Sequence, residues 1–409
     1  MWKKYQQIPM VAKMITGMVL GALAGWYMGP GTAVFQPLGR FFLTCLKCIA
    51  MPLIIVNLLA GIANLDNPES FGRIGGRILL YYVLTSALAL CVGIAAAGII
   101  KPGAGLVLEG KYEGVVASLP SVGATLLSLV PDNAFKALTE GRLDQVVVVT
   151  AFTGIGLLLL PAESRKRLGT LFQDLSDMTS RLVFIVMILA PFGIFAFVAV
   201  SMGKYGSSIF GSLAEFIVCI YASVFTMCCV YALLVYVSAR ITPREFFRKA
   251  LPMMLTAFST TSSTSSIPVN MECAEKLGVP QKAYSFTIPL GAQVNKDGTC
   301  VCLTSIFIMT AQAIGVDVNF GMMMKAIVIS LILTTGSGAI PGGMLMIIPI
   351  LLQSLGFPLE IVGLVAGVYP FCDMGMTMIN CLGDLAGTVL VGSGEKKRDA
   401  QPGTEAVLH

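Results

Sequence analysis

The chain has 409 residues, of which 56% are hydrophobic and only 12% are charged, and its mean hydropathy is +0.83. Because a soluble protein carries about 25% charged residues, this composition excludes an ordinary soluble domain and predicts a polytopic membrane protein. The net charge of +5 is small and scattered, which gives no reason to expect nucleic acid as a partner, and with His409 as the only histidine neither a histidine-dependent enzyme nor a His-ligated metal site is expected.

Six apolar runs of bilayer-spanning length come first in the chain. They lie near residues 10–28, 38–64, 78–100, 145–161, 180–201 and 209–238. The fifth run has an amphipathic lead-in at 168–178. Lys3 and Lys4 make the first run resemble a signal peptide, but no small-residue cleavage site clearly follows it. Trp26 and Tyr27 resemble an interfacial belt, so we expect a retained first helix.

Basic residues alternate with these runs. They cluster at Lys3–Lys4, Arg73–Arg77, Arg165–Arg167 and Arg240–Lys249. The positive-inside rule therefore puts the N-terminus and each cluster in the cytoplasm. The long connection at 101–144, which contains several prolines and glycines, is expected to be an external loop with short helical pieces.

Residues 259–266 form a tract of eight hydroxyl side chains. A soluble Ser/Thr linker is one interpretation. The flanks are apolar, however, and too short to span a bilayer. We therefore favour a re-entrant hairpin whose two half-helices meet within the membrane, with hydroxyls and free backbone groups at its tip.

The next long apolar segment, about 283–311, is broken by a polar stretch at 291–299 that contains Asn295, Lys296 and Asp297. A charged side chain in hydrocarbon costs on the order of 2.5–3.5 kcal/mol, so such residues are usually functional. Glycines in the stretch weaken the helix and can free carbonyls to act as ligands. The alternative is a polar cluster buried between helices for packing alone.

A second candidate hairpin follows, in which residues 334–343 interrupt an apolar segment at 320–355. The two tips resemble each other, since Thr261–Pro268 aligns with Thr334–Pro341 and both end in Ile-Pro. Paired broken segments of this kind indicate an inverted-repeat transporter site.

The last apolar span, about 361–391, carries Asp373, Thr377, Asn380 and Asp384 at spacings of 4, 3 and 4. These spacings put the four side chains on one face of a helix. A polar stripe on an apolar helix predicts a cavity or a polar partner. The basic tail that follows is expected in the cytoplasm.

These features resemble the dicarboxylate/amino acid:cation symporter family over nearly the whole chain. The serine-rich tip, the Pro-Gly second tip and residues 373–384 carry the resemblance, and Asn295–Thr299 matches the family's Asn-Met-Asp-Gly-Thr with Lys296 in place of methionine. The resemblance implies an all-α homotrimer in the plasma (inner) membrane. Each subunit would have eight transmembrane helices plus two re-entrant hairpins, arranged as inverted repeats, and would work as an elevator with both termini cytoplasmic.

The resemblance also implies a division of the chain into two parts. The scaffold would comprise helices 1–2 at 1–75, and an external loop with helices 4–5 at 101–202. The transport domain would comprise helix 3 at 76–100 and residues 203–392, that is helix 6, hairpin 1 at about 243–275, helix 7 at about 282–311, hairpin 2 at about 320–356 and helix 8 at about 359–392. Residues 393–409 would form the cytoplasmic tail.

By the same resemblance, Asp373 would bind the substrate's ammonium group and Asn380 its carboxylate, with Thr299 near the substrate side chain. The substrate-binding set is Ser262, Ser263, Thr264, Thr299, Ile340, Gly342, Asp373, Met376, Thr377 and Asn380. The set for a coupling cation or its surrogate is Tyr82, Thr85, Ser86, Gly291, Gln293, Asn295, Lys296, Asp297, Thr334, Thr335, Ser337, Asn380 and Asp384, with Asn295, Asp297 and Asp384 as the side chains for Na⁺. No cofactor is expected, and Na⁺ or H⁺ is the candidate coupling ion.

Two departures from the family pattern affect the substrate. Acidic-substrate members carry an arginine three residues beyond the Asp-Met-Gly aspartate, where this chain has Met376, and the arginine that some members carry at the first tip is here Thr261. Burying a second substrate carboxylate without a fixed partner would be costly. We therefore predict a small neutral amino acid such as serine, threonine, alanine or cysteine. A Na⁺- or H⁺-coupled acidic amino acid or dicarboxylate symporter is the alternative, and an anion channel is the second.

Lys296 is the third departure, and two interpretations of it remain open. It either extends away or pairs with an aspartate for structure, or its ammonium replaces a transported cation near Asp297 or Asp384, so that fewer Na⁺ ions or none are coupled. Proton coupling is a further option. Gln293, where many members have threonine, favours altered coupling too. An intramembrane enzyme would have Lys296 as its only credible base, so no enzymatic activity is expected.

Overall fold

The computed structural model describes residues 10–63, 68–106, 130–140, 143–206, 208–336 and 343–399. The regular structure within these residues is helical throughout. The helices are α2 (Met10–Met28), the 3₁₀ helix η1 (Gly29–Phe35), α3 (Gln36–Ala63), α4 (Pro68–Ile100), α6 (Ala134–Thr139), α7 (Leu143–Leu158), α8 (Ala162–Met187), α9 (Ala190–Tyr205), α10 (Ser208–Ala239), α11 (Pro243–Thr260), α12 (Ser263–Lys276), α13 (Gln281–Val294), α14 (Asp297–Ala313), α15 (Phe320–Gly336), α16 (Met344–Ser354) and α17 (Glu360–Asp399).

Several of these helices are long and apolar enough to cross a bilayer, as the composition predicts. In the described residues the candidate spans are Ile74–Ile100, Gly211–Ala239, Glu360–Gly394 and Ala12–Phe42, the last of which covers most of α2, η1 and the start of α3. Shorter apolar helices occur at Met51–Ala60, Val148–Leu158, Ala190–Lys204, Phe320–Thr334 and Met344–Ser354. The chain is therefore a multi-pass membrane protein, while the number of eight spans stays a prediction.

The expectation of one continuous helix at 180–201 is wrong. Helix α8 ends at Met187 and α9 begins at Ala190. Pro191 lies in the first turn of α9, where a backbone N–H would have no partner within α9. Because proline has no N–H, the helical hydrogen bonds of α8 cannot continue through it. The amphipathic lead-in is confirmed, because α8 begins at Ala162 and includes it.

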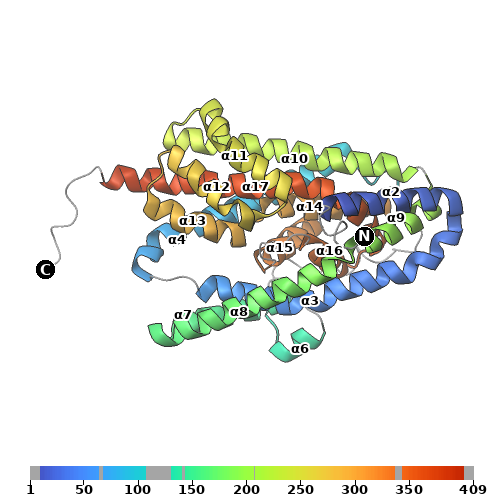
Figure 1. The fold of residues 1–409 in the computed structure, drawn as a ribbon, viewed down its shortest axis with the longest axis horizontal. Helices are drawn as coiled ribbons and strands as arrows, with labels where there is room; N and C mark the ends of the chain where they lie inside the picture. Colours follow the sequence, from blue (N-terminus) through green and yellow to red (C-terminus); the bar gives the residue numbers. More distant parts are fainter. Residues whose placement is uncertain are drawn as a thin grey trace, which may run out of the picture.

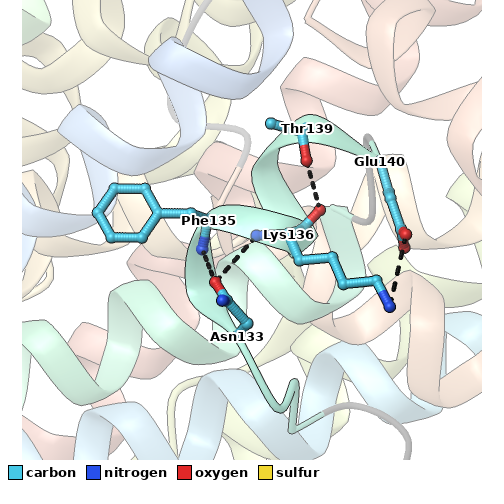
Figure 2. Close-up of polar contacts among 5 residues, drawn as sticks. All are labelled: Asn133, Phe135, Lys136, Thr139 and Glu140. Atoms are coloured by element: carbon cyan, nitrogen blue, oxygen red, sulfur yellow. Dashed lines mark hydrogen bonds and ion pairs between the residues drawn. The ribbon is translucent and has the colours of Figure 1, made fainter.

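The connection at 101–144 contains a short helix, as expected. Asn133 caps α6 by accepting hydrogen bonds from the backbone N–H groups of Phe135 and Lys136, at 2.9 and 3.1 Å (Figure 2). Lys136 of this helix and its C-cap residue Glu140 form an exposed ion pair at 3.8 Å. Residues 107–129 of this connection lie outside the described residues.

The helices pack in two groups. In one, α3 packs along α7 and α8, and α2 packs along α9; in the other, α17 packs against α10, α11 and α13, and α4 packs against α14. Figure 1 shows α3, α7 and α8 along one long edge and α10 and α11 along the opposite edge. The groups meet where α17 contacts α9 and α2, and where α15 and α16 contact α3.

Close packing of α2 on α9 depends on three glycines at a spacing of four, Gly17, Gly21 and Gly25. A Cβ at Gly17 would lie 2.3 Å from the carbonyl oxygen of Pro191, and one at Gly21 would lie 2.5 Å from that of Phe195. Small residues at this spacing let two membrane helices approach closely.

Two of the predicted breaks are confirmed. Helices α11 and α12 form a hairpin in which Thr261 adopts a left-handed conformation (φ 49°, ψ 34°) and the Ser262 side chain caps α12 by accepting from Ser265 N–H. The other break lies at Asn295 and Lys296, which separate α13 from α14 in non-helical conformations. Helices α15 and α16 flank residues 337–342, which lie outside the described residues.

Candidate functional site

The break between α13 and α14 is buried and bound to the middle of α17. Each residue from Asn295 to Thr299 is buried. The Asn380 side-chain oxygen accepts a hydrogen bond from Gly298 N–H at 2.7 Å, and the Asn380 backbone carbonyl accepts one from Asn295 Nδ2 at 3.2 Å. Asn380 therefore caps the N-terminus of α14 and joins the break to the polar stripe.

Gly298 makes this close approach sterically feasible. A Cβ there would lie 2.4 Å from the backbone oxygen of Met376 and 2.6 Å from its Cα. Met376 itself is buried. A residue with a side chain at position 298 would therefore push α17 away from α14.

Asp297 is held by hydroxyl groups from two other helices. Ser86 of α4 donates to Oδ1 at 2.7 Å, and Tyr231 of α10 donates to Oδ2 at 2.6 Å. Thr85 also hydrogen-bonds to this carboxylate. Asp297 is fully buried, so these hydroxyls replace the water that the carboxylate loses.

Asp384 and Asn295 leave two oxygens without a partner. Asn295 Nδ2 donates to Asp384 Oδ1 at 3.0 Å. In the described part of the chain, Asp384 Oδ2 and Asn295 Oδ1 are both buried and lack a hydrogen-bond partner. Because a buried unpaired polar atom costs about 1–3 kcal/mol, this pair of oxygens is suited to bind a small cation.

Gly291 and Tyr82 complete the surroundings of this oxygen pair. A Cβ at Gly291 would lie 2.4 Å from the Tyr82 hydroxyl and 2.5 Å from Asp384 Oδ1. The Tyr82 hydroxyl donates to the carbonyl of Thr287 in α13 at 2.9 Å. The space beside Asp384 is therefore narrow, and any side chain at position 291 would enter it.

The ammonium group of Lys296 binds the end of α13. Its Nζ donates to the carbonyl oxygen of Ala292 at 2.5 Å, and the side chain is buried. Lys296 therefore does not extend to solvent. Among the described residues it forms no ion pair within 4.0 Å, although Asp384 interacts with it electrostatically. The positive charge stands at the negative end of a helix dipole.

Asp373 lies one turn from Thr377 and one turn from Tyr369 on α17. Thr377 donates to Asp373 Oδ1 at 3.4 Å, and the Tyr369 hydroxyl is also hydrogen-bonded to this carboxylate. Asp373 is partly exposed, unlike the buried Asp297 and Asp384. It is therefore the accessible acid of the stripe.

The tip of the α11–α12 hairpin reaches α17. Ser263 and Ser266 hydrogen-bond to the thiol of Cys381, and Asn270 Nδ2 donates to the Cys381 backbone oxygen at 3.0 Å. Ser262 is partly buried at the start of α12, whereas Thr264 is exposed. The first tip thus contacts the same helix that carries the stripe.

Most of the residues expected around the site gather in one cluster, with some exceptions. Gln293 is exposed on α13, so its side chain lies away from the buried cluster. Thr334 is buried on α15, where its hydroxyl accepts from Cys300 Sγ at 3.6 Å. The Thr335 side chain and all of Ser337, Ile340 and Gly342 lie outside the described part of the structure.

Three hydroxyl contacts of the cluster were not predicted from the sequence. Tyr369 extends the stripe by one turn before Asp373, and that spacing was readable in the sequence. Tyr231 carried no signal, because it is a single tyrosine in a long apolar run. The hydroxyls of Thr287 and Thr388 lie 2.7 Å apart and form a hydrogen bond that joins α13 to α17.

Comparison with known proteins places this geometry in context. Residues 10–393 match the model of the sodium:dicarboxylate symporter family. The chain is 29% identical over 398 residues to a proton/sodium-glutamate symport protein of Bacillus subtilis (strain 168), covering 94% of this chain and 92% of that protein. It is 28% identical over 406 residues to a proton/glutamate-aspartate symporter of Escherichia coli (strain K12), covering 95% and 93%. It is also 26% identical over 413 residues to a C4-dicarboxylate transport protein of Bacillus subtilis (strain 168), covering 97% and 96%.

Proposed function

The chain belongs to the sodium:dicarboxylate symporter family, and we propose that it is a carrier of a small neutral amino acid with reduced or absent Na⁺ coupling. Family membership makes it a secondary transporter of the membrane and not an enzyme. Serine, threonine, alanine and cysteine are the first substrates to test. The expected location is the plasma (inner) membrane.

Asp373 is the proposed acceptor for the substrate's ammonium group. It is accessible, and the Tyr369 and Thr377 hydroxyls orient it without neutralising its charge. The Asn380 side-chain oxygen accepts from Gly298 N–H, and we assign its Nδ2 as the donor to the substrate carboxylate. The N-terminus of α12 at Ser263 adds a favourable dipole for that anion.

We infer a substrate with a neutral side chain because the sequence supplies no arginine near the site to bind a second substrate carboxylate. The sequence contains no arginine between Arg248 and Arg398. Met376 occupies the family's arginine position and supplies a flexible apolar surface. Lys296 is bound to Ala292 at the end of α13 and is not oriented toward Asp373 as a counter-ion.

Lys296 carries the coupling proposal. Its ammonium lies on a carbonyl at the C-terminal end of a half-helix, the kind of group that coordinates a coupling ion in transporters of this type. It offsets one of the two negative charges of Asp297 and Asp384. The cluster then needs one cation fewer for balance, and the unpaired oxygens of Asn295 and Asp384 would accept at most a single remaining Na⁺ or H⁺.

The proposed mechanism is an elevator within a homotrimer. The group formed by α4, α10–α14 and α17 carries the site, and the group formed by α2, α3 and α7–α9 carries none of its residues. We assign the first group, together with α15 and α16, to the transport domain (76–100 and 203–392), and the second group to the scaffold (1–75 and 101–202). Sliding of one against the other would move the whole site without dismantling it.

The test is uptake of radiolabelled serine, alanine and threonine into proteoliposomes, with a Na⁺ gradient and with choline replacing Na⁺. Saturable uptake or exchange that persists in choline supports the proposal. Obligatory dependence on Na⁺ would overturn the coupling part. Competition by aspartate or glutamate as strong as by any neutral amino acid would overturn the substrate part.

A second candidate is a Na⁺- or H⁺-coupled symporter of acidic amino acids or dicarboxylates. The names of the similar bacterial proteins favour it. The same competition experiment, extended to succinate and run at two external pH values, separates it from the first. An anion channel would show conductance without saturable counterflow of an amino acid.

A further inference from the structure

A cavity of about 480 Å³ lies between the two helix groups, and its lining contains no residue of the polar cluster. It is lined by side chains of α2, α9, α10 and α17, among them Met18, Leu23, Met202, Ile217 and Phe371. Its volume is in the range of ligand pockets, about 300–1,000 Å³. The packing of these four helices therefore leaves room for a molecule.

The chemistry of the lining restricts what can enter. Apart from the Ser201 hydroxyl and the Trp26 indole N–H, the lining side chains are apolar. A polar or charged ligand would lose its hydration there without gaining enough hydrogen bonds. A hydrocarbon chain makes no hydrogen bonds with water, so it would enter without this cost.

The cavity opens toward the lipid side of α2. Val19, Leu23 and Trp26 on its rim are 47%, 61% and 71% exposed. Trp26 and the adjacent exposed Tyr27 end the helix, where aromatic residues mark the depth of the lipid headgroups. From Trp26 to Met18 the cavity follows α2 for eight residues, about 12 Å, which is close to half of the roughly 30 Å hydrocarbon core.

We propose that this cavity binds one acyl chain of a bilayer phospholipid, with the headgroup held at the depth of Trp26 and the chain extending between α2–α9 and α10–α17. The chain would contact both helix groups at once. It would therefore occupy the space between the two groups while remaining free to move as one group slides against the other. The proposal does not depend on the identity of the substrate or on the coupling ion.

Photo-labelling with a phosphatidylcholine that carries a diazirine in its acyl chain, in vesicles of phosphatidylcholine, tests the proposal. Peptide mass spectrometry of the full-length protein should locate the label on α2 near Met18–Trp26 and on α10 near Leu213–Ile217. Ala214→Phe would fill the cavity from α10. Each methylene removed from an apolar site lowers affinity about fourfold, so displacing two of them should lower this labelling by roughly fifteenfold.

Ala222→Phe is the matched control, because Ala222 is an exposed alanine of the same helix outside the cavity lining. It should leave the labelling of α2 unchanged. Equal labelling of all lipid-facing helices, unaffected by Ala214→Phe, would show only the surrounding bilayer and overturn the proposal. If α2 were not labelled and cross-links formed between two copies of the chain, a second subunit would be covering the cavity. This result would also overturn the proposal.

Discussion

Lys296 donates its ammonium proton to the carbonyl oxygen of Ala292, one helical turn before it, at 2.5 Å. The family's methionine at this position could not make this bond. The bond holds a positive charge at the end of α13, where it interacts electrostatically with Asp384, one of whose oxygens is unpaired in the described residues. The break after α13 and the facing Asp384 of α17 thus combine a fixed cation with acceptors suited to a mobile one.

Lys296→Met should increase Na⁺ dependence, because removing the fixed charge leaves a second negative charge to be balanced by a transported ion. With one additional Na⁺ coupled, a tenfold inward gradient would raise substrate accumulation by up to about tenfold. Proteoliposome uptake in Na⁺ and in choline measures this. Lys276→Met, on an exposed lysine of α12, is the control and should change nothing. Equal responses of both variants would refute a coupling role for Lys296.

Gly291→Ala should abolish substrate-dependent transport. The added methyl group would lie 2.4 Å from the Tyr82 hydroxyl and 2.5 Å from Asp384 Oδ1, so these side chains or α13 would have to shift. Gly98→Ala, in an open position of α4, should instead be neutral or stabilise the helix by about 0.5–1 kcal/mol. Uptake and thermal unfolding in detergent measure both variants. Normal transport by Gly291→Ala would contradict the narrow geometry beside Asp384.

Tyr231→Phe should destabilise the fold by about 1.5–3 kcal/mol, since the 2.6 Å hydrogen bond that Tyr231 donates to the buried Asp297 carboxylate is lost. Thermal unfolding in detergent gives the difference. Tyr236→Phe, on the exposed face of the same helix, should have a change close to zero. If the two variants unfold at the same temperature, Tyr231 does not support Asp297.

Thr261→Gly should stabilise the protein. Threonine is β-branched, and its left-handed conformation at the first hairpin tip costs on the order of 1–3 kcal/mol, which glycine avoids. Thr264→Gly, in the first turn of α12, should instead destabilise by roughly 0.5–1 kcal/mol. A lower melting temperature for Thr261→Gly would mean that the threonine side chain makes a contact that outweighs its backbone strain.

Met376→Arg should let aspartate compete for uptake. The new guanidinium, three residues after Asp373 on the same helix, would supply the cation for a second substrate carboxylate. Inhibition of serine uptake by aspartate measures the change. Met374→Arg, two positions earlier on a different face of α17, should leave the substrate preference as it was. Aspartate competition in the unmodified protein would contradict the predicted neutral preference from the start.

Composition and local pattern were sufficient for much of the fold. Hydropathy predicted the membrane helices, and the hydroxyl tract at 259–266 predicted the α11–α12 hairpin, because a membrane leaves few other structures for short apolar flanks around polar residues. The spacing of Asp373, Thr377, Asn380 and Asp384 predicted one helical face, because the period of an α-helix is local. The end of α8 at Met187 was not predicted, since Pro191 is compatible with either a kink or a new helix.

The partners of each site residue depended on tertiary structure. Nothing local to Tyr231 indicates that its hydroxyl binds Asp297, 66 residues later, or that Ser86 binds the same carboxylate from 211 residues away. Gln293 was expected beside the cation site, but the turn of α13 leaves it exposed. The sequence by itself determined that Lys296 lies in the polar break of an apolar segment, between Asn295 and Asp297. Only the packing of α13 against α17 decided that its ammonium would bind Ala292 and lack an ion pair within 4.0 Å in the described residues, because buried polar groups take whichever partners the assembled helices bring within reach.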